Sequence, residues 1–436
     1  MGWDLVIVAA VLIAYAIVSG RLQGSPVTPA IVFVGAGYLL GSEVLDLFDS
    51  GLDSGGIRVL AEATLALVLF TDAASLDVGA LRREAVMPLR LLVIGLPLTI
   101  ALGALVAVPL LPELGLFEAV VLAVVLAPTD AALGQIVVSD ERLPSRLRQG
   151  LNVESGLNDG ICVPLLFAAI ALAEVERSSA SAGGVLGDLV SQVGIGAGVG
   201  VAVAVVVAVS VAASRRRGWL DGHWAQLVPL ATVMIAYAAT DELGGSGFIG
   251  AFSAGVAYRR VLGASVARRS ALLADEIGGL LSAVTFFVFG ASLIGQGLVN
   301  LDLATIAYAI LSLTLVRMLP VALSLIGSHS ARQTVAFAGW FGPRGLASIV
   351  FLLVIVEEAD LPGAPVIVEV GTMTVLLSVL AHGLSATPLT DRYVRWLAAR
   401  RERLTMENEE TPPDPEDLMR RSPWRRSASS TDPSTR

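Results

Sequence analysis

Long apolar segments recur along almost the whole chain, and they restrict its fold more than any other feature. A helix needs about 20 apolar residues, with a range of about 17–25, to cross the hydrocarbon core of a bilayer. Charged residues make up only 15% of the chain, whereas a soluble domain has about a quarter. We therefore predict an all-α polytopic membrane protein with thirteen transmembrane helices, over residues 3–19, 26–42, 57–76, 85–111, 116–138, 148–173, 185–213, 224–240, 245–263, 275–297, 303–326, 332–356 and 364–388.

The basic residues give this arrangement an orientation. The chain has no lysine, so its 29 basic residues are all arginines. The odd-numbered loops between the predicted spans hold nearly all the loop arginines, the even-numbered loops are acidic, and only Arg58 and Arg177 break the pattern. Loops rich in arginine face the cytoplasm. We therefore expect a multi-pass protein of the cell inner membrane with its N-terminus outside and its C-terminus in the cytoplasm.

Two interruptions divide the chain symmetrically. Pro128 breaks the fifth span and Gly342-Pro343 breaks the twelfth. If spans 1–6 and 8–13 are two halves joined by span 7, both breaks fall in the fifth span of their half, and the halves have opposite orientations in the membrane. Paired interruptions in inverted halves indicate the substrate site of a transporter. We predict a transmembrane domain over residues 1–390, built from two inverted six-helix repeats.

The C-terminal segment has a different composition. Residues 391–436 are rich in charge, Pro and Ser, and contain almost no apolar run after Leu404. Such a composition favours disorder. We predict a mostly disordered cytoplasmic tail that begins with a short amphipathic helix, on which Arg392, Arg395, Arg400 and Arg401 face the inner leaflet.

Polar residues open the sixth span: Glu154, Ser155, Asn158 and Asp159. Charge at the centre of a membrane helix costs about 2.5–3.5 kcal/mol, and acids there usually mark an ion or proton path. The alternative is a soluble loop before the helix. On a helix, Glu154 and Asn158 share one face, and Ser155 and Asp159 share the next. The second pair offers hard oxygen ligands for a small cation, and Asp159 could hold either a proton or a cation.

Two arginines lie inside predicted spans, Arg317 in the eleventh and Arg344 in the twelfth. The guanidinium cannot lose its proton in a protein, so each needs an acceptor at membrane depth. The face of the sixth span that carries Glu154 and Asn158 could meet Arg317. For Arg344 the alternative is a helix end from which the side chain reaches the interface.

Together these motifs resemble one family. Roughly residues 5–390 resemble the monovalent cation/proton antiporters of the NhaP type, which are sodium/proton antiporters. The motifs that carry the resemblance are, in order, Ala127-Pro128-Thr129-Asp130, Glu154-Ser155 with Asn158-Asp159, Arg317, and Gly342-Pro343-Arg344-Gly345. The resemblance implies thirteen helices, crossed unwound helices in the inverted repeats, a homodimer, and a core domain that moves against a dimer domain.

The resemblance also implies roles for single residues. Asp159 carries the cation or the proton, Thr129, Ser155 and Glu154 help to bind Na⁺, and Glu154 pairs with Arg317. Asn158 goes with electroneutral exchange, Asp130 is the acid of the unwound fifth span, and Arg344 belongs to the unwound twelfth. The chain departs from the family at Gly156-Leu157, where two bulky residues are common, which bears on cation preference.

The remaining polar residues carry weaker predictions. Glu62 and Asp72 in the third span either line a cytoplasmic funnel or serve a structural purpose, and Glu369 and His382 in the last span are expected near the interfaces. The single Cys162 excludes a disulfide within the chain, and His223, His329 and His382 are too far apart in sequence for a His-rich metal site. We expect no cofactor and no nucleic acid.

Three functions remain open on this basis. The first is exchange of Na⁺, or Li⁺, for H⁺ by alternating access, with cation and proton competing at Asp159. The second is K⁺/H⁺ exchange or a K⁺ channel, although no carbonyl filter sequence is present for a channel. The third, from another class, is an intramembrane aspartyl protease that uses Asp130 and Asp159.

Overall fold

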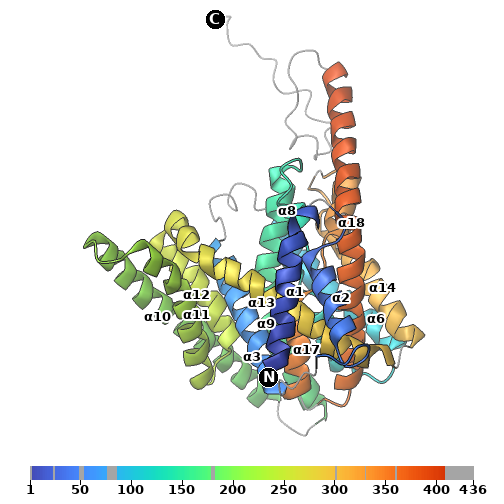
Figure 1. The fold of residues 1–436 in the computed structure, drawn as a ribbon. Helices are drawn as coiled ribbons and strands as arrows, with labels where there is room; N and C mark the ends of the chain where they lie inside the picture. Colours follow the sequence, from blue (N-terminus) through green and yellow to red (C-terminus); the bar gives the residue numbers. More distant parts are fainter. Residues whose placement is uncertain are drawn as a thin grey trace, which may run out of the picture.

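The computed structural model describes residues 2–22, 25–48, 54–75, 86–177, 182–299, 302–328, 330–358 and 361–407. The regular elements of these residues are all helices (Figure 1), which confirms the all-α prediction. In chain order they are α1 (Gly2–Leu22), α2 (Pro29–Leu40), α3 (Ser54–Ser75), α5 (Val86–Arg90), the π-helix η1 (Leu91–Gly95), α6 (Leu96–Leu110), α7 (Leu116–Val125), α8 (Gln135–Val138), α9 (Ser145–Arg177), α10 (Ala182–Arg216), α11 (Gly222–Glu242), α12 (Gly247–Leu262), α13 (Ala264–Val299), α14 (Leu303–Leu313), α15 (Leu315–Ser324), α16 (Arg332–Trp340), α17 (Leu346–Glu358) and α18 (Ala364–Glu407).

Each predicted span contains at least one of these helices. Within the described ranges, seven helical stretches are long and apolar enough to cross a membrane unaided, and α2, α7 and part of α17 are shorter apolar helices. The chain is therefore a multi-pass membrane protein, and the total of thirteen crossings stays a prediction.

Four of the spans are irregular in the structure. The fifth and twelfth spans break where proline interrupts them, between α7 and α8 and between α16 and α17. The eleventh also breaks, at Thr314 (φ −109°, ψ −88°), and the fourth contains the π-helix η1. The π-helix and the break at Thr314 both fall in the fourth span of their predicted half. The sequence analysis predicted neither of them.

The contacts between helices define two groups that pack against each other. One group contains α2, α3, α10, α11, α12 and α13, and the other contains α6, α7, α9, α14, α17 and α18. The groups meet where α3, α10 and α12 pack on α9, where α3 also packs on α17, and where α13 packs on α18. The polar part of α9 thus lies close to the junction between the groups.

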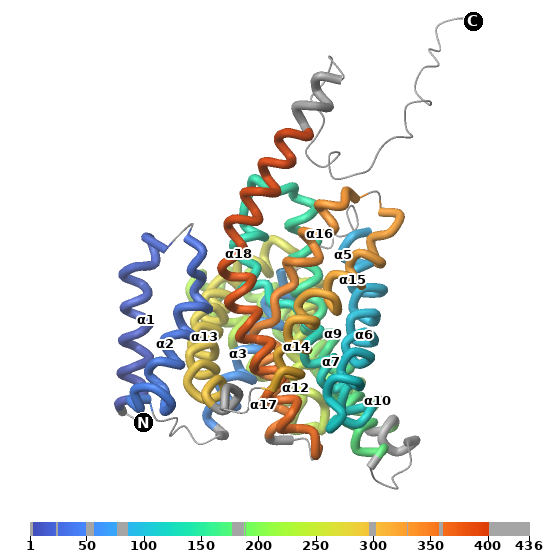
Figure 2. The backbone as a smooth tube through the Cα atoms, turned by 90° about the vertical axis from the view of Figure 1, so that its right-hand side faces the viewer, coloured from blue at the N-terminus to red at the C-terminus, as the bar shows by residue number. Residues whose placement is uncertain are grey.

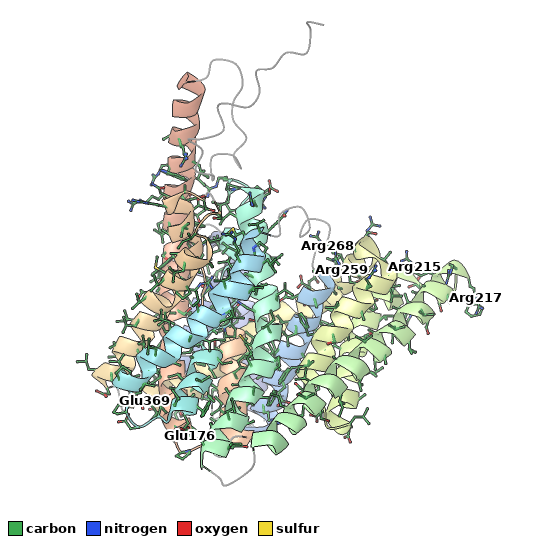
Figure 3. All side chains as sticks on the ribbon, turned by 180° about the vertical axis from the view of Figure 1, so that it is seen from behind. Glu176, Arg215, Arg217, Arg259, Arg268 and Glu369 are labelled. Atoms are coloured by element: carbon green, nitrogen blue, oxygen red, sulfur yellow. The ribbon has the colours of Figure 1, made fainter. Side chains whose placement is uncertain are left out.

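Charge is distributed unequally between the two ends of the bundle (Figure 3). Arg215, Arg217, Arg259 and Arg268 lie toward one end, and Glu176 and Glu369 lie toward the other. The alternation of loop charges along the sequence thus becomes a separation of charge in space.

Helix α18 differs from the expected last span because it continues to Glu407, across the predicted boundary at residue 390. Its extension rises beyond the other helices at the end that carries the arginines (Figures 1 and 2). Arg392 and Arg395 are exposed, but Tyr393 and Leu397 are buried against other helices of the protein, so the apolar face of the extension does not lie on the inner leaflet as expected. The side chain of Arg401 and residues 408–436 lie outside the described part of the chain.

Candidate functional site

The two proline-containing interruptions meet inside the bundle. The backbone N–H of Asp130 donates to the carbonyl of Pro343 at 2.8 Å. The carboxylate of Asp130 accepts hydrogen bonds from both interrupted segments. Oδ1 accepts from the N–H groups of Ala132 (2.7 Å) and Leu133 (3.1 Å), and Oδ2 accepts from that of Leu346 (2.7 Å), at the start of α17. Free N–H groups at a helix start attract negative charge. Asp130 therefore holds the two interrupted segments together.

Arg344 lies at the C-terminal end of α7, whereas Asp130 lies at the N-terminal end of α17. It is fully buried, and its Nη1 donates to the carbonyls of Ala127 (2.6 Å) and Pro128 (3.0 Å), just beyond the end of α7. The alternative of a side chain that reaches the interface is therefore wrong. Carbonyls at a helix end are unpaired and partially negative, so a buried guanidinium satisfies them.

Two glycines make this close approach possible. A Cβ atom at Gly345 would collide with the carboxylate of Asp130, and one at Gly342 would collide with the guanidinium of Arg317. Any side chain at either position would push the interrupted segment away from its charged partner.

Glu154 and Arg317 form a bidentate ion pair. Arg317 Nη1 lies 2.5 Å from Glu154 Oε1, and Nη2 lies 2.9 Å from Oε2. The side chain of Glu154 is only 3% exposed and that of Arg317 only 5%. The pair joins α9 to α15 immediately after the break at Thr314, and two charges that are costly in a membrane become compatible with burial.

The polar residues of α9 also meet the interruption after α7. The hydroxyl of Thr129 lies 3.0 Å from that of Ser155, and the amide of Asn158 donates to Thr129 Oγ1 at 2.7 Å. Asn158 therefore contacts Thr129, whereas Glu154, on the same helix face, contacts Arg317. The structure brings together Thr129, Ser155 and Asn158 as one hydroxyl and amide cluster, buried throughout.

Asp159 is the acid of this region that lacks a partner. Its Oδ1 is buried without a hydrogen-bond partner, and the side chain lines a cavity of about 650 Å³ together with Asp130 and Asp72. The cavity also reaches Arg146 and Arg268, and Arg268 lies toward the arginine-rich end (Figure 3). A buried oxygen without a donor is costly, so this carboxylate is suited to hold a proton or a cation.

Asp72 and Glu62, the two acids of the third span, lie in different environments. Asp72 lines the cavity and lies against Gly156, where an added Cβ would be 3.2 Å from Asp72 Cβ. Glu62 does not line the cavity, because ten residues of helix place it about 15 Å further along α3. It pairs instead with Arg58 at 2.5 Å and accepts the hydroxyl of Tyr237 at 2.9 Å. A funnel role therefore remains proposed for Asp72 alone.

The expectation for His382 was wrong, and that for Glu369 was incomplete. His382 is 1% exposed in the middle of α18, because this helix runs on well past the predicted end of the span. Its partners are the carbonyl of Trp340 and residue Ser378, four positions earlier. Glu369 is half-buried and accepts the hydroxyl of Thr305 at 3.2 Å. The i, i+4 spacing of Ser378 and His382 in an apolar helix was the available signal.

Comparisons with known proteins agree with this arrangement. The family described as "Sodium/hydrogen exchanger, transmembrane" matches residues 7–392. Proteins named K(+)/H(+) antiporter NhaP2 from Shewanella sp. (strain MR-4) and Shewanella baltica (strain OS223) are 28% and 27% identical over 388 residues, or 87% of this chain. The match spans only 65% and 64% of these relatives, respectively. A solved structure of the sodium proton antiporter MjNhaP1 from Methanocaldococcus jannaschii has a TM-score of 0.75 at 20% identity, and covers 90% of this chain and 98% of that one.

Proposed function

The chain belongs to the transmembrane sodium/hydrogen exchanger family, and on this premise we propose that it exchanges a monovalent cation for protons across the cell inner membrane. Membership confirms the predicted class, a transporter and not an enzyme. The observation that carries the proposal is the buried oxygen of Asp159, which has no hydrogen-bond partner and belongs to a side chain that lines the cavity. A protease dyad is disfavoured, because three backbone N–H groups occupy the carboxylate of Asp130.

The proposed cycle uses the two groups of helices as moving parts. The group that contains α7, α9 and α17 carries the site and moves against α3, α12 and α13, so that Asp159 faces first one side of the membrane and then the other. In each crossing Asp159 holds one proton or one cation. Thr129 and Ser155 supply hydroxyl oxygens for the cation, and Glu154 stays ionised against Arg317.

The charges of the site favour electroneutral exchange. Glu154 is balanced by Arg317, and the carboxylate of Asp130 is held by three N–H donors. We take Asp159 as the group that changes its occupant, and Asp72, which also lines the cavity, as keeping one charge state throughout the cycle. The carboxylate of Asp159 carries no net charge with either a bound proton or a bound monovalent cation. The membrane potential then does no work on the exchange.

We propose Na⁺ as the cation and K⁺ as the alternative. The hydroxyl and carboxylate ligands suit a small, hard ion, and the MjNhaP1 structure is that of a sodium proton antiporter. K⁺ is favoured by the Shewanella relatives, which are named K(+)/H(+) antiporter NhaP2. Proton flux in reconstituted vesicles after pulses of Na⁺, Li⁺ and K⁺ separates the two, and no response to any of the three would refute the exchange.

Lower pH on the cation-loading side should raise the apparent KM for the cation with little loss of maximal rate, because proton and cation compete for Asp159. The measurement is the initial rate of exchange against cation concentration at several pH values. A maximal rate that falls while KM stays constant would indicate separate sites for proton and cation.

A reporter fused to the C-terminus should be protected from protease added outside intact cells. The arginine-rich end of the bundle, beyond which α18 extends, faces the cytoplasm under the positive-inside rule, and the N-terminus then lies outside. A reporter that is cleaved from outside would contradict the predicted orientation of the C-terminus, and, with the N-terminus also outside, the odd number of spans. The predicted homodimer is tested separately, by the mass of the purified protein in detergent.

A further inference from the structure

His382 lies at the point where α18 contacts the end of α16. Its Nε2 is 2.9 Å from the carbonyl oxygen of Trp340, the last residue of α16 before the interruption. The two rings also lie against each other, with centroids 5.1 Å apart. The interruption leaves carbonyls at the end of α16 without helical partners. The carbonyl of Trp340 accepts the backbone N–H of Gly342 at 2.8 Å, and His382 supplies a second donor from another helix.

Both ring nitrogens of His382 face hydrogen-bond acceptors. Nε2 faces the carbonyl of Trp340, and Nδ1 lies 3.0 Å from the backbone carbonyl of Ser378 and 3.1 Å from its hydroxyl. A carbonyl only accepts hydrogen bonds, so either nitrogen could donate to the carbonyl that it faces. With the proton on Nε2, the ring donates to Trp340 and Nδ1 accepts the proton of the Ser378 hydroxyl, which links α16 to Ser378 through the ring.

Ser378 extends this chain to the interruption itself. Its hydroxyl oxygen accepts the backbone N–H of Arg344 at 2.7 Å. The side chain of Arg344 in turn holds the carbonyls of Ala127 and Pro128, and Thr129 of the hydroxyl and amide cluster follows directly. A series of contacts therefore runs from α18 through Arg344 to the carbonyls of Ala127 and Pro128, and Pro128 is the residue before Thr129.

We propose that His382 is a positioning residue for cation binding, which acts through Ser378 and Arg344 on the backbone around Thr129. It does not touch the cation. The inference rests on the proposed cation exchange, and it adds a role for α18, which is otherwise remote from Asp159. Loss of the imidazole removes the hydrogen bond that links α18 to the end of α16, and the segment that bears Arg344 can then shift.

Three variants test this role in reconstituted vesicles. His382→Phe keeps the ring but removes both nitrogens, and should raise the apparent KM for the cation about tenfold, the effect of one lost hydrogen bond of ordinary strength. His382→Gln keeps a donor within reach of Trp340 and should stay within about twofold of wild type. Ser385→Ala is the control. The Ser385 hydroxyl contacts the indole N–H of Trp340 at 2.9 Å and the backbone carbonyl of His382 at 3.5 Å, so its loss leaves the imidazole and the path to Arg344 intact.

The pattern of results separates positioning from folding. A merely structural His382 would lower the melting temperature and the yield of His382→Phe, while the folded protein kept the wild-type KM, and that result would overturn the proposal. Equal KM increases in the Phe and Gln variants would overturn it as well. If the wild type exchanges no cation at all, the proposed function fails first.

The tautomer gives a readout that does not depend on transport. The chain has only three histidines, so ¹⁵N NMR of the labelled protein can resolve them, and His382→Gln assigns the signal. In the proposed arrangement the ring proton lies on Nε2 and donates to the Trp340 carbonyl. A proton on Nδ1 alone would remove the link between His382 and α16 and overturn the proposal, whatever the transport assay shows.

Discussion

Asp159→Asn should abolish cation binding and cation-driven proton movement while the protein still folds and inserts. Asparagine has nearly the same shape but cannot ionise, so it leaves a buried cation without a counter-charge. An uncompensated buried charge costs about 3–5 kcal/mol, which corresponds to a loss of at least about a hundredfold in affinity. Isothermal titration with Na⁺ and proton flux in vesicles measure the two effects.

Glu62→Gln is the matched control for this substitution. It also neutralises a carboxylate of the same bundle, but one that lies outside the cavity and pairs with Arg58. We expect exchange close to that of wild type. Full exchange by Asp159→Asn would refute the role of Asp159, whereas exchange that depends strongly on membrane potential would refute only electroneutrality and point to a second titrating group such as Asp130.

Glu154→Ala and Arg317→Ala should each destabilise the protein by about 3–5 kcal/mol, because either change leaves the partner charged and buried. The double variant should be less destabilised than the sum of the two, since it leaves no unpaired charge. Thermal unfolding in detergent measures all three, and transport should fall in parallel.

Arg142 provides the comparison, because it pairs with both Asp140 and Asp391. Its side chain is 55% exposed, and ion pairs in contact with solvent contribute little to stability. Arg142→Ala should therefore change the unfolding temperature little. An effect of Arg317→Ala no larger than that of Arg142→Ala would mean that the buried pair does not hold α9 to α15.

The sequence predicts those features that depend on local composition or on the cost of charge in a bilayer. Apolar runs of helical length locate the spans, and prolines mark the interruptions after α7 and α16. The contact between Glu154 and Arg317 was foreseeable because two opposite charges at membrane depth need each other. The assignment of Asp159 as carrier rests on resemblance and on its unpaired oxygen, and awaits the substitution above.

Features that depend on tertiary packing were not predictable in this way. No proline or glycine marks the break at Thr314, and nothing in the composition fixes the end of α18, which is held by Tyr393 and Leu397 in a cluster of other helices. Glu62 and Asp72 share one helix, and only the position of the cavity along α3 separates their environments. The hydrogen bonds of Asp130 and His382 depend on which backbone groups the interruptions bring near them.

The contact between Asp130 and Leu346 has a consequence for synthesis of the protein. The two residues are 216 positions apart, and ribosomes add about 5–20 residues per second. The carboxylate of Asp130 thus waits roughly 10–40 s for the N–H group that completes its bonding, and Ala127 and Pro128 wait as long for Arg344. During this interval the first half of the nascent chain holds unpaired polar groups at membrane depth, so it must remain beside water, lipid headgroups or the insertion machinery until the second half arrives.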